Sequence, residues 1–241
     1  MSAQRMRRRV RARLPREQRV AQIMRCARQL FCEKGYAATS TAEIAARAGL
    51  VEGALYRYFP SKQQLLLRVI ESFYTQILAD YERQLQGVRG TWNRLRFLIW
   101  KHLSVMHEEP AMCRLIVHEL RPSPLYRKSS VFELNRRYTQ CTLAVIKEGI
   151  RAGELRADLP LEVVRDLIFG GAEHHTWTYL RGEGEFSPAV SADAITELIY
   201  RGLACAPRVA AADAPVRRLE RAVQRLEGLT GARRARRAAG G

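Results

Sequence analysis

Apolar residues return at steps of three and four along most of the chain, the spacing that places them on one face of an α-helix. One such face lies near the N-terminus and precedes Gly35, a candidate C′ residue; its members are Val20, Ile23, Met24, Ala27, Leu30 and Phe31. Beyond Pro60 the same spacing continues, with glycines and prolines between the segments, through 62–86, 91–107, 110–120, 124–152, 160–181 and 189–204. No persuasive strand or hairpin signal occurs there, so the chain is predicted to be all-α.

Residues 41–59, with the sequence TAEIAARAGLVEGALYRYF, predict two short helices around a glycine turn. Ala45 falls where the two helices pass closest, and a larger side chain would push them apart. Gly49 takes the turn position, where a positive φ costs little only without a Cβ. Leu50 and Leu55 close the small core beneath the second helix. The pattern predicts a helix-turn-helix, whose second helix enters the major groove of DNA; a generic helical hairpin is the alternative.

Two capping-box spacings mark helix starts on either side of this motif. Ser40 and Glu43 have the spacing at the first helix, and Ser61 and Gln64 repeat it after Pro60. Together with the amphipathic segment upstream, these signals predict a three-helix head.

The run LFCEKGYAATSTAEIAARAGLVEGALYRYFPSKQQLL resembles the DNA-binding head of the TetR family of bacterial transcriptional repressors. It carries the landmarks LF-x-x-x-GY, IA-x-x-AG, G-x-LY-x-YF and SK-x-x-LL. The resemblance implies a three-helix helix-turn-helix head followed by a larger helical bundle for ligand binding and dimerisation. The expected domains are a basic arm at 1–14, the head at 15–61, the bundle at 62–204 and an Ala- and Arg-rich extension at 205–241.

The resemblance also implies which residues touch a double-stranded DNA operator. The expected contacts are Thr41, Arg47, Gly53, Ala54, Tyr56, Tyr58 and Lys62. Arg57 is a further candidate, and the alternative is that it is a solvated surface arginine. For Tyr56 and Tyr58 the alternative is packing inside the head. Lys62 lies in the first turn of a helix, where its ammonium and the free amide donors share a phosphate oxygen.

Glu52 departs from the family pattern. Many members have serine and then a basic or polar residue after the turn, whereas this chain has Val51 and Glu52. A carboxylate cannot hold a phosphate. Glu52 therefore accepts a hydrogen bond from a cytosine amino group, points away from the DNA, or orients a neighbouring arginine.

Net charge adds a second DNA signal, located at the ends of the chain. Of the formal net charge of +17, the first fourteen residues carry six arginines and no acid, and residues 207–241 carry nine arginines against three acids. Basic arms of this kind add salt-dependent affinity for nucleic acid without reading its sequence. For the C-terminal arm, the alternative is a tail that only increases solubility.

Helix-turn-helix operators are commonly two-fold symmetric, because one head contacts few base pairs, so a homodimer is expected. The stretch LEVVRDLIFGGAEHHTWTYL supplies the candidate interface, with small residues that let helices approach closely. The interface residues expected here and on a second helix are Val164, Leu167, Ile168, Gly171, Ile195, Leu198 and Ile199. The resemblance implies a four-helix interface between protomers; packing of this face inside one protomer is the alternative.

Large apolar side chains gather in the middle of the body, where they line a ligand cavity or fill a core. Two segments, RLIVHELRPSPLYRKSSVFELNRRY and EGIRAGELRADLPLEVVRDLIFGGAEHHTWTYL, are similar to the body of repressors of fatty-acid degradation of the FadR type, which respond to long-chain acyl-CoA. An acyl chain needs an apolar tunnel, and coenzyme A brings negative charges that arginines at the tunnel mouth would meet. Solvated surface arginines are the alternative. The expected ligand residues are Trp100, Met106, Met112, Arg121, Phe132, Arg136 and Tyr138.

Enzyme, metal and cofactor functions find little support. His174 and His175 are adjacent on a predicted helix and point about 100° apart. His102 and His107 are five residues apart and share no face well, and no zinc, P-loop or nucleophile-elbow motif occurs. The five cysteines form no C-x-x-C pair, and no apolar run suits a bilayer or a secretory signal, so a cytoplasmic protein with reduced thiols is expected.

The sequence therefore predicts a homodimeric, ligand-responsive transcriptional repressor, with fatty-acid degradation genes as its targets and long-chain acyl-CoA as its effector. One alternative is a repressor of a multidrug efflux pump induced by hydrophobic compounds. Another, of a different class, is an architectural DNA-binding protein without sequence specificity.

Overall fold

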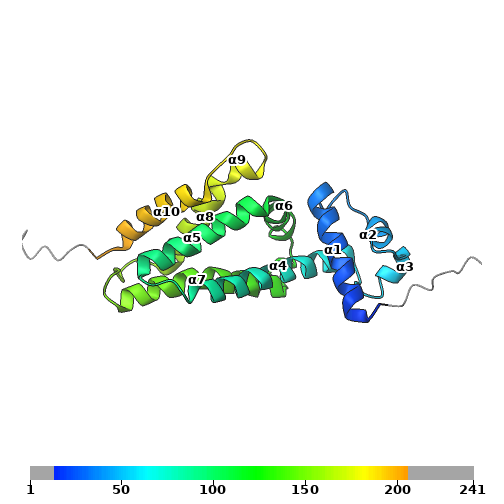
Figure 1. The fold of residues 1–241 in the computed structure, drawn as a ribbon, viewed down its shortest axis with the longest axis horizontal. Coiled ribbons are helices and arrows are strands. Elements are labelled where there is room, and N and C mark those ends of the chain that lie inside the picture. The colour runs from blue at the N-terminus through cyan, green and yellow to red at the C-terminus, as the bar shows by residue number, and fades with distance from the viewer. Residues whose placement is uncertain (1–13, 206–241) are drawn as a thin grey trace, which may run out of the picture.

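A computed structural model describes residues 14–205, and this part of the chain consists of helices joined by loops (Figure 1). Within it, the isolated β-bridge between Leu155 and Ala204 lies outside any strand, and the all-α prediction is confirmed. The α-helices are α1 (Arg16–Lys34), α2 (Thr41–Arg47), α3 (Glu52–Leu55), α4 (Lys62–Leu85), α5 (Thr91–Glu108), α6 (Pro110–Arg114), α7 (Ser130–Arg151), α8 (Leu161–His175), α9 (Trp177–Leu180) and α10 (Pro188–Leu203).

Helices α1 to α3 form a head at one end of the molecule, and α4 leads from it into a longer body (Figure 1). Ala45 of α2 is fully buried, and Gly49 adopts φ +68° in the turn that follows this helix. The Leu50 N–H donates to the Ala45 carbonyl at 2.8 Å and closes this turn. Leu55 is buried beneath α3, as predicted. The small side chain and the glycine therefore set the helix-turn-helix geometry.

The two predicted helix starts differ in detail. At α2, the Ser40 side chain accepts from the Glu43 N–H and the Glu43 carboxylate accepts from the Ser40 N–H, so the capping box is complete. At α4, Ser61 Oγ accepts from the Gln64 N–H at 3.1 Å, which supplies the forward half of the same motif.

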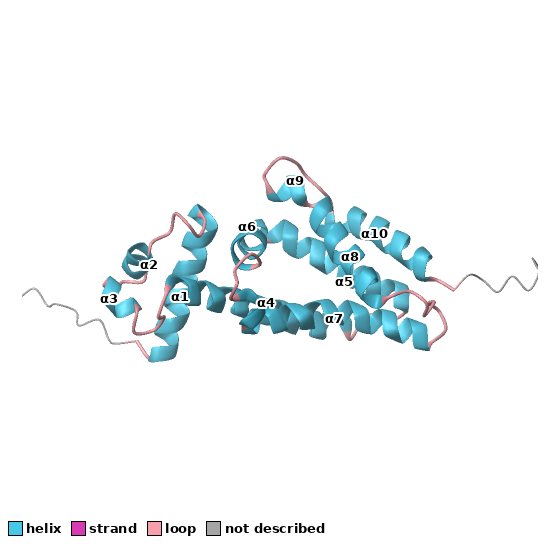
Figure 2. Cartoon of the chain, turned by 180° about the vertical axis from the view of Figure 1, so that it is seen from behind, coloured by secondary structure: helices cyan, strands magenta, loops and turns pink. Residues whose placement is uncertain are grey.

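In the body, α5 and α7 run alongside α4, and α10 packs against α5 (Figure 2). Gly149 of α7 lies against the start of α5, where a Cβ would come within 2.7 Å of the Thr91 side chain and 2.8 Å of Leu155. One continuous apolar core extends from Ile23 in α1 to Leu203 in α10. The predicted boundary after residue 61 falls at the first residue of α4, a helix that packs on both head and body.

Two predicted helices have different bounds in the structure. The segment 124–152 was expected to be helical throughout, but α7 begins only at Ser130, after a 3₁₀ turn at Tyr126–Lys128. Ser129, between the 3₁₀ turn and α7, has an extended backbone with φ −95° and ψ 154°, and this break sets the start of α7 at Ser130. The segment 160–181 divides into α8 and α9 at Thr176, whose buried hydroxyl donates to the Ala172 carbonyl at 3.0 Å.

The segment 110–120 is helical as predicted, although its second half, Leu115–Leu120, winds as a π-helix. The N-terminal arm before Leu14 and the C-terminal extension beyond Cys205 lie outside the described residues. Among the helices of residues 14–205, each is too short or too polar to span a bilayer.

Candidate functional site

The outer face of α3 presents a small polar cluster. The Thr41 hydroxyl, at the start of α2, donates to the Glu52 carboxylate at 2.5 Å and lies 3.2 Å from the Tyr56 hydroxyl. Tyr56 is 47% exposed, and Glu52 is exposed as well. Gly53, between them, is open enough that a Cβ there would meet no atom within 4 Å. The cluster brings together three predicted DNA-contact residues, Thr41, Glu52 and Tyr56, on a face that solvent reaches.

The recognition helix is shorter than expected, since α3 ends at Leu55 and Tyr56 is its C-cap residue. Ala54 is half-buried on this helix and Arg57 is exposed just after it. Tyr58 is partly buried against the core, and the Arg16 guanidinium lies 5.9 Å from its ring centre. Tyr58 therefore packs against the head and does not extend freely toward solvent.

Two predicted phosphate-binding cations already have partners inside the head. Arg47 forms an ion pair with Glu33 of α1 at 2.9 Å, and both side chains are substantially exposed. Lys62 Nζ donates to the Thr39 carbonyl at 2.6 Å and lies 4.3 Å from the centre of the Tyr36 ring. The Lys62 bond holds the loop before α2, and the Arg47 pair joins α2 to α1. A phosphate contact from either cation has to share or replace them.

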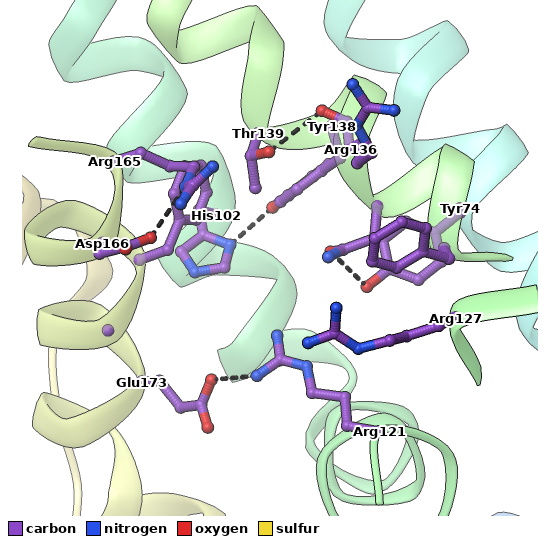
Figure 3. Close-up of a pocket in the computed structure, with 14 residues that line it drawn as sticks. Tyr74, His102, Arg121, Arg127, Arg136, Tyr138, Thr139, Arg165, Asp166 and Glu173 are labelled. Atoms are coloured by element: carbon purple, nitrogen blue, oxygen red, sulfur yellow. Dashed lines mark hydrogen bonds and ion pairs between the residues drawn. The ribbon is translucent and has the colours of Figure 1, made fainter. Parts of the chain in front are cut away.

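The body contains a cavity of roughly 590 Å³ where α4, α5, α7 and α8 meet (Figure 3). Four arginines from three parts of the chain point to it; they are Arg121, Arg127, Arg136 and Arg165. Two of them have carboxylate partners in the cavity wall, because Arg121 pairs with Glu173 at 2.6 Å and Arg165 pairs with Asp166 at 2.8 Å. Within the described residues Arg127 makes no ion pair, so this wall keeps a positive charge for an anionic ligand.

A second, narrow space of roughly 50 Å³ adjoins the first and shares five lining residues with it: Tyr74, His102, Arg121, Tyr138 and Glu173. Its other lining residues are mostly apolar; they are Phe73, Ile77, Val105, Met106, Cys113, Ile116 and Val117. We call the larger space the arginine cavity and the smaller one the apolar end. At this size the apolar end holds no more than a few water molecules.

A chain of hydrogen bonds ends at two residues that line both spaces. The Tyr138 hydroxyl lies 2.6 Å from His102 Nδ1 (Figure 3). On its other side, the Tyr138 hydroxyl lies 2.8 Å from the hydroxyl of Tyr81. Burial raises the pKa of both tyrosines well above the ordinary range, so both remain protonated. Burial, and to a lesser degree the charge of Arg121, lowers the pKa of His102 to about 4. The imidazole is therefore neutral at physiological pH.

Five of the seven predicted ligand residues line these spaces: Met106, Arg121, Phe132, Arg136 and Tyr138. The other two predictions do not fit, because Trp100 and Met112 line neither space. Met112 is fully buried in the core, and Trp100 packs on Phe97 with ring centres 6.0 Å apart. A large apolar side chain has the core as its default position, and these two follow it.

Sequence reasoning missed His102 as a lining residue, together with one face of α8. His102 and Met106 are four residues apart on α5, and Arg165, Phe169 and Glu173 follow the same step on α8. Helical spacing contained the signal, since residues four apart share a face. Mixed polar and apolar residues concealed it. No group of three His, Cys, Asp or Glu side chains suited to a metal ion occurs within residues 14–205.

The predicted interface separates into exposed and buried residues. Val164 and Ile168 are 5% and 1% exposed, so their side chains pack in the protomer's own core. Leu167 and Leu198 are instead 61% and 74% exposed, and Gly171 is exposed beside them. Ile195 and Ile199 are partly buried. Neighbouring apolar residues of α8 therefore lie on different faces, one buried in the protomer and one exposed.

The outward residues form a surface that we call the α8/α10 patch, defined by Val163, Leu167 and Gly171 of α8 and by Val190 and Leu198 of α10. The two helices pack on each other, and on each the patch residues recur at four- or eight-residue steps. Leaving four large aliphatic side chains at least half exposed is unfavourable in water. This surface suits contact with another chain.

Comparison with known proteins gives consistent results over both parts of the chain. Residues 23–69 match the bacterial regulatory proteins of the tetR family, and residues 89–203 match the tetracyclin repressor-like C-terminal domain. The chain is 24% identical over 182 residues to the fatty acid metabolism regulator protein of Bacillus subtilis, covering 76% of this chain and 94% of that protein. It is 25% identical over 161 residues to the repressor KstR2 of Mycolicibacterium smegmatis, covering 66% and 77% of the two chains.

A solved structure of the regulator FadR from Bacillus subtilis, in complex with stearoyl-CoA, has the same fold with a TM-score of 0.67. That comparison covers 76% of this chain and 98% of the other at 24% identity.

Proposed function

This chain is a DNA-binding repressor of the TetR family of bacterial regulatory proteins, and we propose that it controls fatty-acid degradation genes and leaves its operator when it binds a long-chain acyl-CoA. The family consists of transcriptional regulators, not enzymes, whose members bind DNA operators and small-molecule effectors. The proposal concerns the effector, the target genes and the homodimer.

The observation that carries the proposal is the joining of the arginine cavity to the apolar end. An acyl-CoA has phosphates at one end and a hydrocarbon chain at the other, and these match the two spaces in polarity and order. Arg127 supplies positive charge in the arginine cavity, and Arg136, which pairs with Glu133 at 3.3 Å, lies in the same wall. Phe73, Met106 and Ile116 offer hydrocarbon at the narrow end. The names of the relatives, one of fatty acid metabolism and one solved with stearoyl-CoA, support this choice of ligand.

The apolar end is too small for a long acyl chain, and this suggests how binding acts on the DNA. An entering chain has to displace side chains of α4, α5 and the π-helical segment Leu115–Leu120. Because α4 also supports the head, such displacement changes the separation of the two heads of a dimer. Heads that no longer match successive major grooves lose their operator.

The homodimer is supported by the α8/α10 patch. Homodimer interfaces are more apolar than the rest of a protein surface, and a two-fold axis through the patch would align the same helices of both protomers. Leu198, the most exposed of these residues, is then buried against the partner.

The test is displacement of the protein from the DNA upstream of its own gene, followed by fluorescence anisotropy at moderate salt. Palmitoyl-CoA or oleoyl-CoA at micromolar concentration should release the duplex, whereas coenzyme A alone should not. Arg127→Ala should require several times more ligand, since one charge-assisted contact to phosphate is lost. Release by hydrophobic drugs, with no effect of acyl-CoA, would instead support an efflux-pump repressor. Equal binding to random duplexes would support an architectural protein.

A further inference from the structure

His102 Nε2 is a buried polar atom with no hydrogen-bond partner within the described residues. Burying a polar nitrogen without a partner is unfavourable, because its hydrogen bonds to water are lost and not replaced. His102 is also one of the residues that the arginine cavity and the apolar end share. The unsatisfied atom therefore belongs to a side chain at the junction of the two spaces.

The hydrogen-bond chain determines whether this atom is a donor or an acceptor. If Tyr81 donates to Tyr138 and Tyr138 donates to Nδ1 of the neutral His102, both buried hydroxyl protons have acceptors. The Nε2–H is then the single unpaired donor. In the reverse arrangement, His102 Nδ1–H donates to Tyr138 and Tyr138 donates to Tyr81. The Tyr81 proton then has no acceptor as well, because the hydrogen bond of the Tyr81 hydroxyl is the one with Tyr138. The first arrangement leaves fewer groups unsatisfied and makes Nε2 a donor.

We propose that His102 donates its Nε2–H to the thioester carbonyl oxygen of the acyl-CoA, and that this bond makes the site selective for a thioester. The inference rests on the proposed function, because it assumes an acyl effector in these two spaces. In such a ligand, the thioester joins the phosphate-bearing half to the hydrocarbon chain. His102 joins the arginine cavity to the apolar end in the same order.

The charges around His102 favour a neutral carbonyl over the carboxylate of a free fatty acid. Glu173 shares both spaces with His102 and would repel a second carboxylate, and its partner Arg121 is already engaged with it at 2.6 Å. The lowered pKa of His102 keeps the imidazole uncharged, so no cation forms to balance a carboxylate there. A thioester oxygen carries no charge and needs only the donor.

Access to the nitrogen requires one side chain to turn. Nε2 has no solvent contact, and the Phe169 ring meets the His102 ring edge-on with centres 5.0 Å apart. Phe169 also lies in the wall of the arginine cavity. Phe169 is thus the candidate to turn when a ligand oxygen approaches the nitrogen.

The test compares palmitoyl-CoA with its thioether analogue, S-hexadecyl-CoA, which lacks the carbonyl oxygen. Wild type should bind the thioester roughly five- to twentyfold more tightly, as calorimetry measures it, because the thioether leaves the donor unpaired. In His102→Phe this ratio should fall to about one. A purely structural role of His102 would weaken both ligands equally and keep the ratio. A wild-type ratio near one overturns the proposal.

Two tyrosine variants provide a matched pair that does not depend on replacing the histidine. Tyr138→Phe removes the hydroxyl that fixes the tautomer and should reduce the thioester preference. Tyr81→Phe leaves the bond between Tyr138 and His102 in place and should keep it. If Tyr81→Phe loses the preference and Tyr138→Phe keeps it, the direction assigned to the chain is wrong and the proposal fails.

Palmitate separates the two possible acceptors, and operator release separates this inference from the proposed function. If His102→Phe weakens palmitate but not palmitoyl-CoA, the site reads a carboxylate and the thioester proposal is overturned. If palmitoyl-CoA and the thioether both release the operator with equal affinity, only the role of His102 fails. If neither ligand binds wild type, the acyl-CoA function itself fails.

Discussion

At the scale of single residues, His102 gives the fold a dependence on pH. Its pKa is about 4 in the folded chain, against 6.5 for an unperturbed histidine. As pH falls below 6.5, the unfolded chain takes up a proton at this position while the folded chain does not. The free energy of unfolding therefore decreases with falling pH until the folded-state pKa is reached, and below that pKa the loss is complete.

This linkage predicts a difference between wild type and His102→Phe. From about pH 7.5 to about pH 5, the histidine should cost the wild type about 2 kcal/mol of stability that the variant does not lose. Urea unfolding at both pH values measures the difference. The exposed His174, replaced by glutamine, is the control and should leave the pH dependence of wild type unchanged. Parallel pH profiles for wild type and His102→Phe would contradict the assigned burial.

Other single residues show which features of a site a sequence can predict. Ala45 and Gly49 were predictable, because each is the residue type that its local geometry requires. The bond between Thr41 and Glu52 was not, since it joins side chains on two helices and depends on how the turn aims them. It adds a fourth reading to the three considered for Glu52: the carboxylate holds α3 against the start of α2.

At the scale of helices, periodicity predicted the existence of the long elements and failed at boundaries and faces. Helix α4 and helix α5 lie within one residue of the predicted segments. The start of α7 was misplaced because apolar spacing continues through the proline-containing loop 121–129. On α8, spacing could not tell which of two apolar stripes faces inward. The structure shows Val164 and Ile168 inside and Leu167 outside, so the α8/α10 patch is narrower than predicted.

The patch predicts that a charge at its centre prevents dimerisation. Leu198 is 74% exposed in the protomer, so Leu198→Glu should fold normally, with a melting temperature within a few degrees of the wild-type protomer. Burying the new carboxylate against a partner is costly, so the mass from light scattering should shift from dimer to monomer at micromolar concentration. Operator affinity should fall at least tenfold, about 1.4 kcal/mol.

The control for this experiment places the same charge on an exposed site of another helix. Ala144 of α7 is exposed and lies outside the patch, and Ala144→Glu should keep the dimer mass and the operator affinity. A dimer that persists in Leu198→Glu at the same concentration would assign the interface to a different face.

At the scale of the whole molecule, the head and the ligand spaces meet at one aromatic side chain. Phe73 of α4 lines the apolar end, and it also lines a groove of roughly 640 Å³ between α1 and α4. On the groove side, the Arg28 guanidinium of α1 lies 5.6 Å from the centre of the Phe73 ring. Arg28 also pairs with Glu109, between α5 and α6, at 2.6 Å. A chain that entered the apolar end would therefore contact a ring that also lies against α1 of the head.

Sequence reasoning had no access to this connection. Arg28 and Glu109 are 81 residues apart, and each is an ordinary surface residue in its own segment. The ion pair is partly exposed and contributes little to stability, about 1 kcal/mol at most. Its importance lies in position, because it joins α1 of the head to the end of α5, the helix that carries His102 and Met106.

The connection predicts that Arg28→Ala separates the two binding events without abolishing either. Free protein should bind operator and palmitoyl-CoA within about threefold of wild type, since Arg28 lines neither the arginine cavity nor the outer face of α3. The ratio of palmitoyl-CoA affinities for free and operator-bound protein should shrink at least fivefold, because the contact that transmits the displacement of Phe73 is gone. Because the coupling between two sites is reciprocal, the effect of palmitoyl-CoA on operator affinity should shrink by the same factor.

Arg68→Ala is the matched control, because among residues 14–205 Arg68 pairs within its own helix, with Glu71 at 2.6 Å, and joins no two elements there. It should keep the wild-type ratio. If Arg28→Ala also keeps it, the head moves through α4 alone, and the contact between Arg28 and Phe73 is a packing feature with no part in the response. If the ratio collapses in Arg28→Ala and in Glu109→Gln alike, both sides of the guanidinium are needed to carry the movement from the ligand to the DNA.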